Sequence, residues 1–311
     1  ELDRVGGTRL TLTAQTPDGA PPDSATLGEA QQTIGARVRG LGISDAQVDV
    51  AGATLTVAVP GDATALADIG RPGRLVIRPV LQTVPATAAG EQPEPAGTLG
   101  ERVAAAQQLR QATDPAQQSQ ALTRLAQRCG AEDVLAGNDD PALPLVTCAT
   151  DGTSAYLLAP VIIGGDQIRN ASSPTDPQQG GNIVEVTFKK EAAAAWTDYT
   201  GAHVGSQVAF TLDSQVLSAP VIRDALPDRR TQITGDFTEA QARELASVLN
   251  RPPLPVPFAI TDTEPVPAKP EKSVFAAPEF GLIGIGVVLM IGLIGGLVFA
   301  SMRGGGPAGP E

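Results

Sequence analysis

The first eighty residues alternate between strand-like and helix-like patterns of apolar side chains. Residues 8–14 (TRLTLTA) place an apolar side chain at every second position, which is the period of a half-buried strand. Apolar side chains then recur at helical spacing up to Leu41, with Thr26 and Glu29 in capping-box positions and Gly42 suited to a left-handed helix end. A βαββαβ-like half is completed by predicted strands at 47–50, 54–59 and 74–78 and a short helical segment at 63–69.

The last folded stretch repeats this order of elements. The pattern predicts a strand at 183–188, a helix at 189–200 closed by Gly201, and a hairpin over 208–219. A strand at 231–235 then precedes a final helix. This helix begins with a capping box formed by Thr238 and Gln241, and its inward-facing residues are Leu245, Val248 and Leu249. Two similar halves around one sheet predict an α+β fold with a ferredoxin-like, two-halved base.

An insertion separates the two halves. It holds two Ala/Gln-rich helices near 101–112 and 116–127, a loop with both cysteines, and the apolar run YLLAPVII. We therefore expect a head subdomain with its own small core, whose loops are the surface that a partner would contact. The predicted division is 1–81 for the first half of the base, 82–181 for the inserted head, and 182–260 for the second half of the base.

The C-terminal region has the composition of a membrane anchor. Residues 280–302 contain no charge, and as a helix they would extend about 34 Å, enough to cross a hydrocarbon core of roughly 30 Å. We predict one transmembrane helix there, preceded by a Pro-rich stalk at 261–279 and followed by a short tail at 303–311. A stripe of small residues suits contact with another membrane helix, although glycine is also simply common in membrane spans: Gly292, Gly296 and Ala300.

The charge of the chain excludes one class of partner. The net charge is −12, the pI is near 4.6, and no cluster of basic residues exists to neutralise a phosphate backbone. Nucleic acid is therefore not an expected partner. The use of arginine over lysine, with much Ala, Gly and Pro, indicates a GC-rich bacterial gene.

The two cysteines, Cys129 and Cys148, have no histidine nearby and no CxxC spacing, so a zinc site is not indicated. In an oxidising compartment such a pair forms one disulfide, which would close a loop of about 20 residues and contribute roughly 3 kcal/mol. The alternative is two buried free thiols in the cytosol. The disulfide interpretation places the folded domain on the extracytoplasmic side of the membrane.

The sequence gives no indication of catalysis, a metal or a cofactor. The single histidine, His203, is expected to be a surface or packing residue, and Asn138 to Asp140 form a turn or helix cap rather than a calcium loop. The glycine pairs at 164–165 and 180–181 lack the spacing of phosphate-binding loops, and Asp213 and Asp224 are interpreted as turn residues. We predict that the protein is not an enzyme.

Several stretches in one order resemble the first extracytoplasmic domain of the SecD family, the protein-export translocase subunits. They are 6–10 (GGTRL), 37–60, 137–148 (GNDDPALPLVTC), 156–171 (YLLAPVIIGGDQIRNA), 199–224 and 232–250. The 137–148 segment is similar to the SecD subgroup with paired cysteines in its head. At Asp213-Ser214 the chain departs from the family's Asp-Gly turn, and because serine tolerates positive φ less well, a longer or different turn is expected.

The resemblance implies a membrane-anchored protein that assists protein export or membrane-protein assembly. Its implied partners are the Sec translocon, other membrane subunits and unfolded exported polypeptide, which an apolar groove of the head would bind. After residues 254–257 (LPVP) a SecD continues into helices that form a proton channel with SecF, whereas residues 280–302 carry no ionisable side chain for a proton relay. We therefore expect that the chain is not itself the motor. The alternative is a structural accessory subunit of another envelope complex that reuses the SecD domain.

Overall fold

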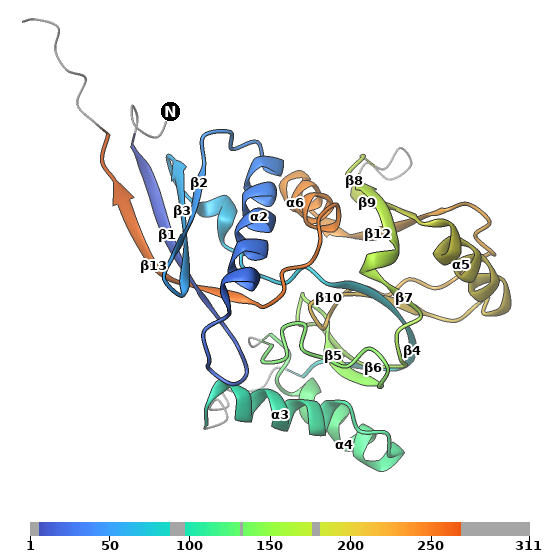
Figure 1. Cartoon of the computed structure of the whole chain (residues 1–311). Coiled ribbons are helices and arrows are strands. Elements are labelled where there is room, and N and C mark those ends of the chain that lie inside the picture. Colours follow the sequence, from blue (N-terminus) through green and yellow to red (C-terminus); the bar gives the residue numbers. More distant parts are fainter. Residues whose placement is uncertain (1–5, 88–96, 131–132, 176–180, 269–311) are drawn as a thin grey trace, which may run out of the picture. The chain divides into compact units, whose positions relative to one another are not determined.

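Figure 1 shows the computed structural model, which describes residues 6–87, 97–130, 133–175 and 181–268. The helices are α2 (Ser24–Gly40), α3 (Leu99–Arg110), α4 (Pro115–Ala126), α5 (Lys190–Ala202) and α6 (Glu239–Leu249), with 3-10 turns η1 (Thr64–Leu66) and η2 (Gly165–Gln167). The strands are β1 (Gly7–Ala14), β2 (Gln47–Ala51), β3 (Thr54–Pro60), β4 (Leu75–Pro85), β5 (Leu145–Cys148), β6 (Ser154–Leu158), β7 (Ile163–Gly164), β8 (Ile168–Ser172), β9 (Asn182–Phe188), β10 (Val208–Leu212), β11 (Gln215–Ser218), β12 (Arg230–Phe237) and β13 (Phe258–Val266).

The two ends of the described chain meet in one antiparallel sheet, which we call the base sheet. Its strand order is β13-β1-β3-β2, and α2 packs against it over a core that includes Leu12, Ile34 and Val57. The prediction that a stalk begins at residue 261 was wrong, because β13 pairs with β1 from Phe258 to Val266. Pro265 is compatible with this pairing because β13 is an edge strand, where alternate residues have an N–H that faces away from the partner strand and makes no ladder hydrogen bond.

The predicted single sheet with two similar halves is not what the structure contains. Strand β4 pairs with β10 and with β6, giving a central sheet of order β11-β10-β4-β6-β5. Strands β12, β9 and β8 form a separate outer sheet. Strand β9 pairs with β8 of the predicted head, and β10 pairs with residues 75–79 of β4, which we predicted to be in the first half of the base. Within the described residues, none of the strands from β9 to β12 pairs with the base sheet. The chain is α+β with antiparallel sheets, but the second stretch packs with the insertion.

The largest apolar core lies between the central and outer sheets. Trp196 of α5 packs against Phe188 of β9 and Phe210 of β10, with ring centroids 5.9 and 6.3 Å apart respectively. Both α5 and α6 contribute small apolar side chains to this cluster, in keeping with the low aromatic content of the sequence. Because these contacts join the two sheets, they fix β10 relative to β9 and β12.

Two of the predicted helix ends differ from the structure and two agree with it. Helix α2 begins after Asp23, whose Oδ1 accepts from the Thr26 amide at 2.7 Å, so the expected capping box of Thr26 and Glu29 is not formed. Gly42 has φ +85°, as predicted for the residue after the helix. Helix α5 continues through Gly201 to Ala202, whereas the capping box at Thr238 of α6 is present as predicted.

A two-residue turn between β10 and β11 is buried and joins three segments of the chain. Asp213 (φ +49°) and Ser214 (φ +71°) form this β10–β11 turn. The expectation of a longer or different turn was wrong, because a two-residue turn with positive φ at both positions is the type that Asp-Gly favours. Asp213 accepts hydrogen bonds from the Gly73 and Arg74 amides, at 3.0 and 2.8 Å. Ser214 Oγ accepts from the Gly137 amide at 2.9 Å. These bonds offset the cost of the left-handed conformation, which side chains other than glycine rarely adopt.

Residues 69–72, which connect the base to β4, are bound by Arg37 of α2. Its guanidinium donates to the carbonyls of Ile69, Arg71 and Pro72, at 3.2, 2.5 and 2.6 Å. Burial lowers the pKa of Arg37 to about 10, and the charge of Asp213 partly offsets this effect. The path from η1 to β4 is therefore bonded on one side to the base helix and on the other to the β10–β11 turn.

The membrane predictions fall outside the described residues. These are the helix at 280–302, with the contact residues Gly292, Gly296 and Ala300, and the tail at 303–311. Among the residues that the structure does describe, none of the helices has the length and apolar character needed to cross a bilayer.

Candidate functional site

Helices α3 and α4, which we call the helix pair, both begin at a residue whose side chain caps the helix. Thr98 and Glu101 form a capping box at the start of α3, and Asp114 accepts from two amides of α4, which has Pro115 in its first turn. Such caps satisfy amides that would otherwise lack acceptors and typically stabilise a helix by about 1 kcal/mol each. The predicted Ala/Gln-rich helices are present, each starting one or two residues earlier than expected.

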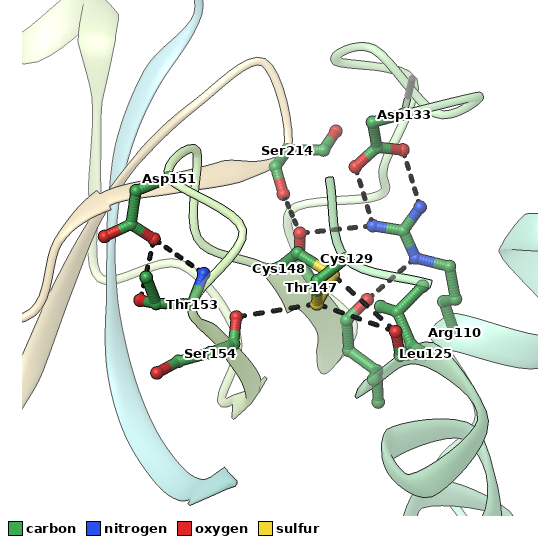
Figure 2. The surroundings of a disulfide bond; sticks show 11 residues. Arg110, Leu125, Cys129, Asp133, Thr147, Cys148, Asp151, Thr153, Ser154 and Ser214 are labelled. Atoms are coloured by element: carbon green, nitrogen blue, oxygen red, sulfur yellow. Dashed lines mark hydrogen bonds and ion pairs between the residues drawn. A yellow bond between two sulfur atoms is a disulfide. The ribbon is translucent and has the colours of Figure 1, made fainter. Parts of the chain in front are cut away.

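A disulfide attaches the helix pair to the central sheet, as Figure 2 shows. Cys129 follows the end of α4 and Cys148 is the last residue of β5, with their Cα atoms 5.5 Å apart. The alternative of two free thiols is wrong for this structure. Cys148 is buried, and Leu122 and Ala126 of α4 pack with Val146 of β5 in a small apolar cluster beside it. The bond therefore fixes α4 on the sheet at the point where this core ends.

A buried arginine–aspartate pair lies beside the disulfide (Figure 2). Both Nη atoms of Arg110, the last residue of α3, donate to the two carboxylate oxygens of Asp133, at 2.6 and 2.9 Å. Arg110 Nε donates to the Val146 carbonyl at 2.8 Å, and Nη2 donates to Thr147 Oγ1 at 3.2 Å. A bidentate pair with additional acceptors is the geometry in which a buried guanidinium is best satisfied.

The pKa of Asp133 follows from this geometry. Burial alone would raise it, but the charge and hydrogen bonds of Arg110, together with the Leu135 amide, hold the pKa of Asp133 below its usual value. The carboxylate is therefore ionised at neutral pH and neutralises Arg110. As a result the pair anchors the loop after Cys129 to the end of α3 rather than offering a free charge to a ligand.

A second buried pair lies in the segment that we predicted to be a simple turn. Asp139 Oδ2 accepts from Arg78 of β4 at 2.7 Å, and Asp139 Oδ1 accepts from Ser214 Oγ at 2.6 Å. Asp140 does act as a turn residue, since its Oδ1 accepts from the Ala142 amide. The sequence carried no signal for the Arg78–Asp139 pair, because the two residues lie on different elements and neither belongs to a recognisable motif.

A groove of about 370 Å³ runs along the helix pair. Its apolar lining includes Ala105, Leu109 and Leu125, and Leu109 is 41% exposed. Arg124 and Arg128 also line it, and within the described residues neither forms an ion pair. An apolar groove bordered by arginine side chains suits an apolar or weakly acidic segment of polypeptide.

The other candidate residues take packing or turn positions. The ring of His203 stacks on Tyr199, with centroids 4.1 Å apart, at the end of α5. Asp224 is exposed in the loop after β11, whereas Asp213 is a turn residue that is fully buried. In the ranges that the structure describes, no three His, Cys, Asp or Glu side chains come close enough together to hold a metal ion.

One protein-family model matches the chain. It is described as the SecDF P1 head subdomain, and it covers residues 144–256. This region runs across the predicted boundary at residue 181 and includes most of the segment that we predicted to be the second half of the base. The strand pairing agrees with this range, because strands β9 to β12 belong to the central and outer sheets and not to the base sheet.

The chain is similar to known translocase subunits over most of its length. The protein translocase subunit SecD of Mycobacterium tuberculosis (strain H37Rv) is 40% identical over 94% of this chain and 63% of that protein. The corresponding subunit of Thermobaculum terrenum is 28% identical over 93% of this chain and 58% of that protein. The chain therefore spans less than two thirds of the length of these relatives.

Solved structures of SecDF share the fold. A crystal structure of SecDF in a super-membrane-facing form covers 85% of this chain and 32% of that chain, with a TM-score of 0.55 and 24% identity. A second structure, from work on SecDF as a membrane component that enhances protein export, covers 82% of this chain and 98% of that chain, with a TM-score of 0.50. At this identity the likeness is one of fold.

We predict that reduction of the disulfide lowers the free energy of unfolding by roughly 3 kcal/mol, because the unfolded chain regains loop entropy. Urea denaturation of the full chain in detergent, with and without reductant, measures the difference. The Cys129→Ser/Cys148→Ser variant is the control, since the sequence holds only these two cysteines and reductant should not affect it further. Equal stability of the oxidised and reduced wild type would contradict this role.

The contribution of the Arg110–Asp133 ion pair to stability can be measured by replacing Asp133. We expect Asp133→Asn to lower the free energy of unfolding by about 3 kcal/mol at pH 7, because Arg110 is left without a counter-charge. Since the pKa of Asp133 is lowered in the folded state, the contribution of the carboxylate is full above about pH 4 and is lost as pH falls through the folded value. The difference between wild type and variant should therefore shrink in acid. The exposed residue Asp224, changed to Asn, serves as the control, and a pH-independent difference would argue against the pair.

Proposed function

Since the chain is a homologue of SecD over most of its length, we propose that it assists protein export or membrane-protein assembly by binding translocating polypeptide or the translocon. The observation that carries the proposal is the 40% identity to a SecD over 94% of the chain. The role is one of binding rather than catalysis. Protein translocation is the function of that relative by name, and it is extended to this chain as a proposal.

We propose a division into base and head that follows strand pairing rather than sequence order. The base comprises the sheet β13-β1-β3-β2 with α2, and the head comprises everything from β4 to α6. Two connections join them: the segment before β4, which Arg37 holds, and the segment after α6. The family model for the head lies mainly within the second of these units, which supports the division.

The proposed location is the cell membrane, with the folded domain on the extracytoplasmic side. The disulfide supports this side, because such bonds persist in oxidising compartments. The charge-free segment 280–302 would be a membrane-spanning helix, and its small residues would contact other membrane subunits. Without an ionisable side chain, that segment would not relay protons.

The groove of the helix pair is the part of the head that we propose contacts polypeptide. Its lining is mainly apolar, so it can gain free energy from unfolded segments, which expose apolar side chains that a folded protein hides. The buried Arg110–Asp133 pair and the disulfide keep the groove in shape without a ligand. A pre-formed groove loses less conformational entropy on binding than a flexible one.

Site-specific photocrosslinking in membrane vesicles that carry out export tests this proposal. A photoreactive residue at Leu109 should crosslink to a translocating polypeptide, whereas one at Gln108, exposed on the same helix outside the groove, should crosslink much less. Leu109→Glu should weaken the interaction about tenfold through loss of apolar contact. Crosslinks only to envelope proteins unrelated to export would favour the accessory-subunit alternative, and equal crosslinking from Leu109 and Gln108 would contradict the groove.

A further inference from the structure

A second cavity lies beside strand β12, away from the helix pair. It has a volume of about 610 Å³ and is lined by Trp196 of α5, Phe210 of β10 and the loop that follows β11. That loop presents apolar side chains to solvent at this cavity: Val221 is 49% exposed and Leu226 is 36% exposed. They are two of the six exposed large apolar side chains in the described ranges, and both belong to the same loop. This concentration of exposed apolar side chains at one cavity favours a binding surface.

Strand β12 borders the same cavity and has an open edge. It is the outermost strand of the outer sheet and pairs only with β9. The Phe188 amide donates to the Arg229 carbonyl, and the register continues with Thr231 opposite Val186 and Ile233 opposite Val184. In an antiparallel ladder alternate residues make these bonds, so the main-chain groups of the residues between them point away from β9.

Arg230 and Gln232 are those residues, and both line the cavity. Within the described ranges, no main-chain group of another segment bonds to their outward N–H and C=O groups. Residues 230–233 contain no lysine or proline and pair with β9 without a register shift, so the charge of Arg230, partly neutralised by Glu185, is the only usual edge protection in this part of the strand. The edge is therefore available to pair with another extended chain.

An unpartnered polar group inside the lining adds an independent observation. Trp196 is only 1% exposed, and its indole N–H has no hydrogen-bond acceptor in the structure. A buried N–H without a partner costs about 1 to 3 kcal/mol, so buried Trp side chains usually have an acceptor. A ligand that brings a carbonyl oxygen into this cavity, with a small local shift, would supply one.

We propose that an extended segment of unfolded polypeptide adds to β12 as a new strand of the outer sheet. Its main chain bonds to Arg230 and Gln232, one apolar side chain enters the cavity beside Val221, and a peptide carbonyl accepts from the Trp196 indole. The inference rests on the proposed function and adds how the polypeptide is held. Recognition through main-chain groups is largely independent of sequence, which suits a protein that must bind many different chains.

The charges around the cavity agree with broad recognition. Its polar lining combines basic and acidic side chains, so neither sign of charge dominates. They are Arg223, Arg230, Glu185, Asp224 and Asp228. Arg230 and Glu185 are 3.5 Å apart and partly neutralise each other. Selection by charge is therefore weak here, in contrast to the groove of the helix pair.

Two variants at one position separate main-chain pairing from side-chain effects. Gln232→Pro removes the outward N–H at a position where an edge strand tolerates proline, whereas Gln232→Thr keeps the N–H and a strand-forming side chain. The probe is a fluorescent, carboxymethylated polypeptide that cannot fold, and binding to the full chain in detergent is measured by anisotropy. We expect Gln232→Pro and Val221→Asp to weaken binding at least tenfold, and Gln232→Thr to bind like wild type.

Amide hydrogen exchange on the wild type covers the case in which Gln232→Pro does not fold. Exchange at Arg230 and Gln232 should slow when the polypeptide is added. Unchanged exchange there, or Gln232→Pro binding like wild type, would overturn the inference, and the proposed function would survive if Leu109→Glu still weakened binding. No binding of the probe to wild type would overturn both. A dimer that forms through β12, seen by sedimentation and abolished in Gln232→Pro without loss of polypeptide binding, would also overturn the inference.

Discussion

The fold depends on a buried turn of two residues. Both residues have the left-handed backbone conformation, which side chains other than glycine rarely adopt. Asp213 and Ser214 both have positive φ and are almost completely excluded from solvent. Burial raises the pKa of Asp213, although the Arg74 and Gly73 amides and the nearby arginines act in the opposite direction. The turn is stabilised because the carboxylate and amide of Asp213 and the hydroxyl and carbonyl of Ser214 all have hydrogen-bond partners. Gly73, with φ +76°, must remain glycine because a Cβ there would lie 2.5 Å from Val248 and 2.7 Å from the Arg37 guanidinium.

Both proposed binding surfaces are connected to this turn. Thr147 donates to the Ser214 carbonyl and accepts from Arg110, so the turn is linked through β5 to the buried pair under the helix-pair groove. Strand β10, which leads into the turn, carries Phe210, and that side chain lines the cavity beside β12. A displacement of the turn would therefore alter both surfaces. The base is linked to the turn as well. Arg37 of the base helix binds the Pro72 carbonyl, and the next residue, Gly73, donates its amide to Asp213.

Local structure was largely predictable from the sequence, and long-range pairing was not. The alternation in residues 8–14, the capping box at Thr238 and the hairpin around Asp213 are signals carried by a few neighbouring residues, and all three correspond to observed elements. No local signal shows that β4 pairs with both β10 and β6, or that β13 returns to β1. Because the first and last folded stretches have a similar order of elements, we predicted one shared sheet, whereas their strands lie in three sheets. The Arg78–Asp139 pair was missed for the same reason, since its partners lie 61 positions apart.

Site-resolved hydrogen exchange of the Gly73, Arg74 and Gly137 amides tests the central role of the β10–β11 turn most directly. All three belong to loops, and loop amides ordinarily exchange through local fluctuations that need little free energy. If the turn holds these segments together, the three amides should exchange as slowly as the amide of Phe210 in β10, through global unfolding. Fast exchange at the three amides while Phe210 stays protected would contradict the account.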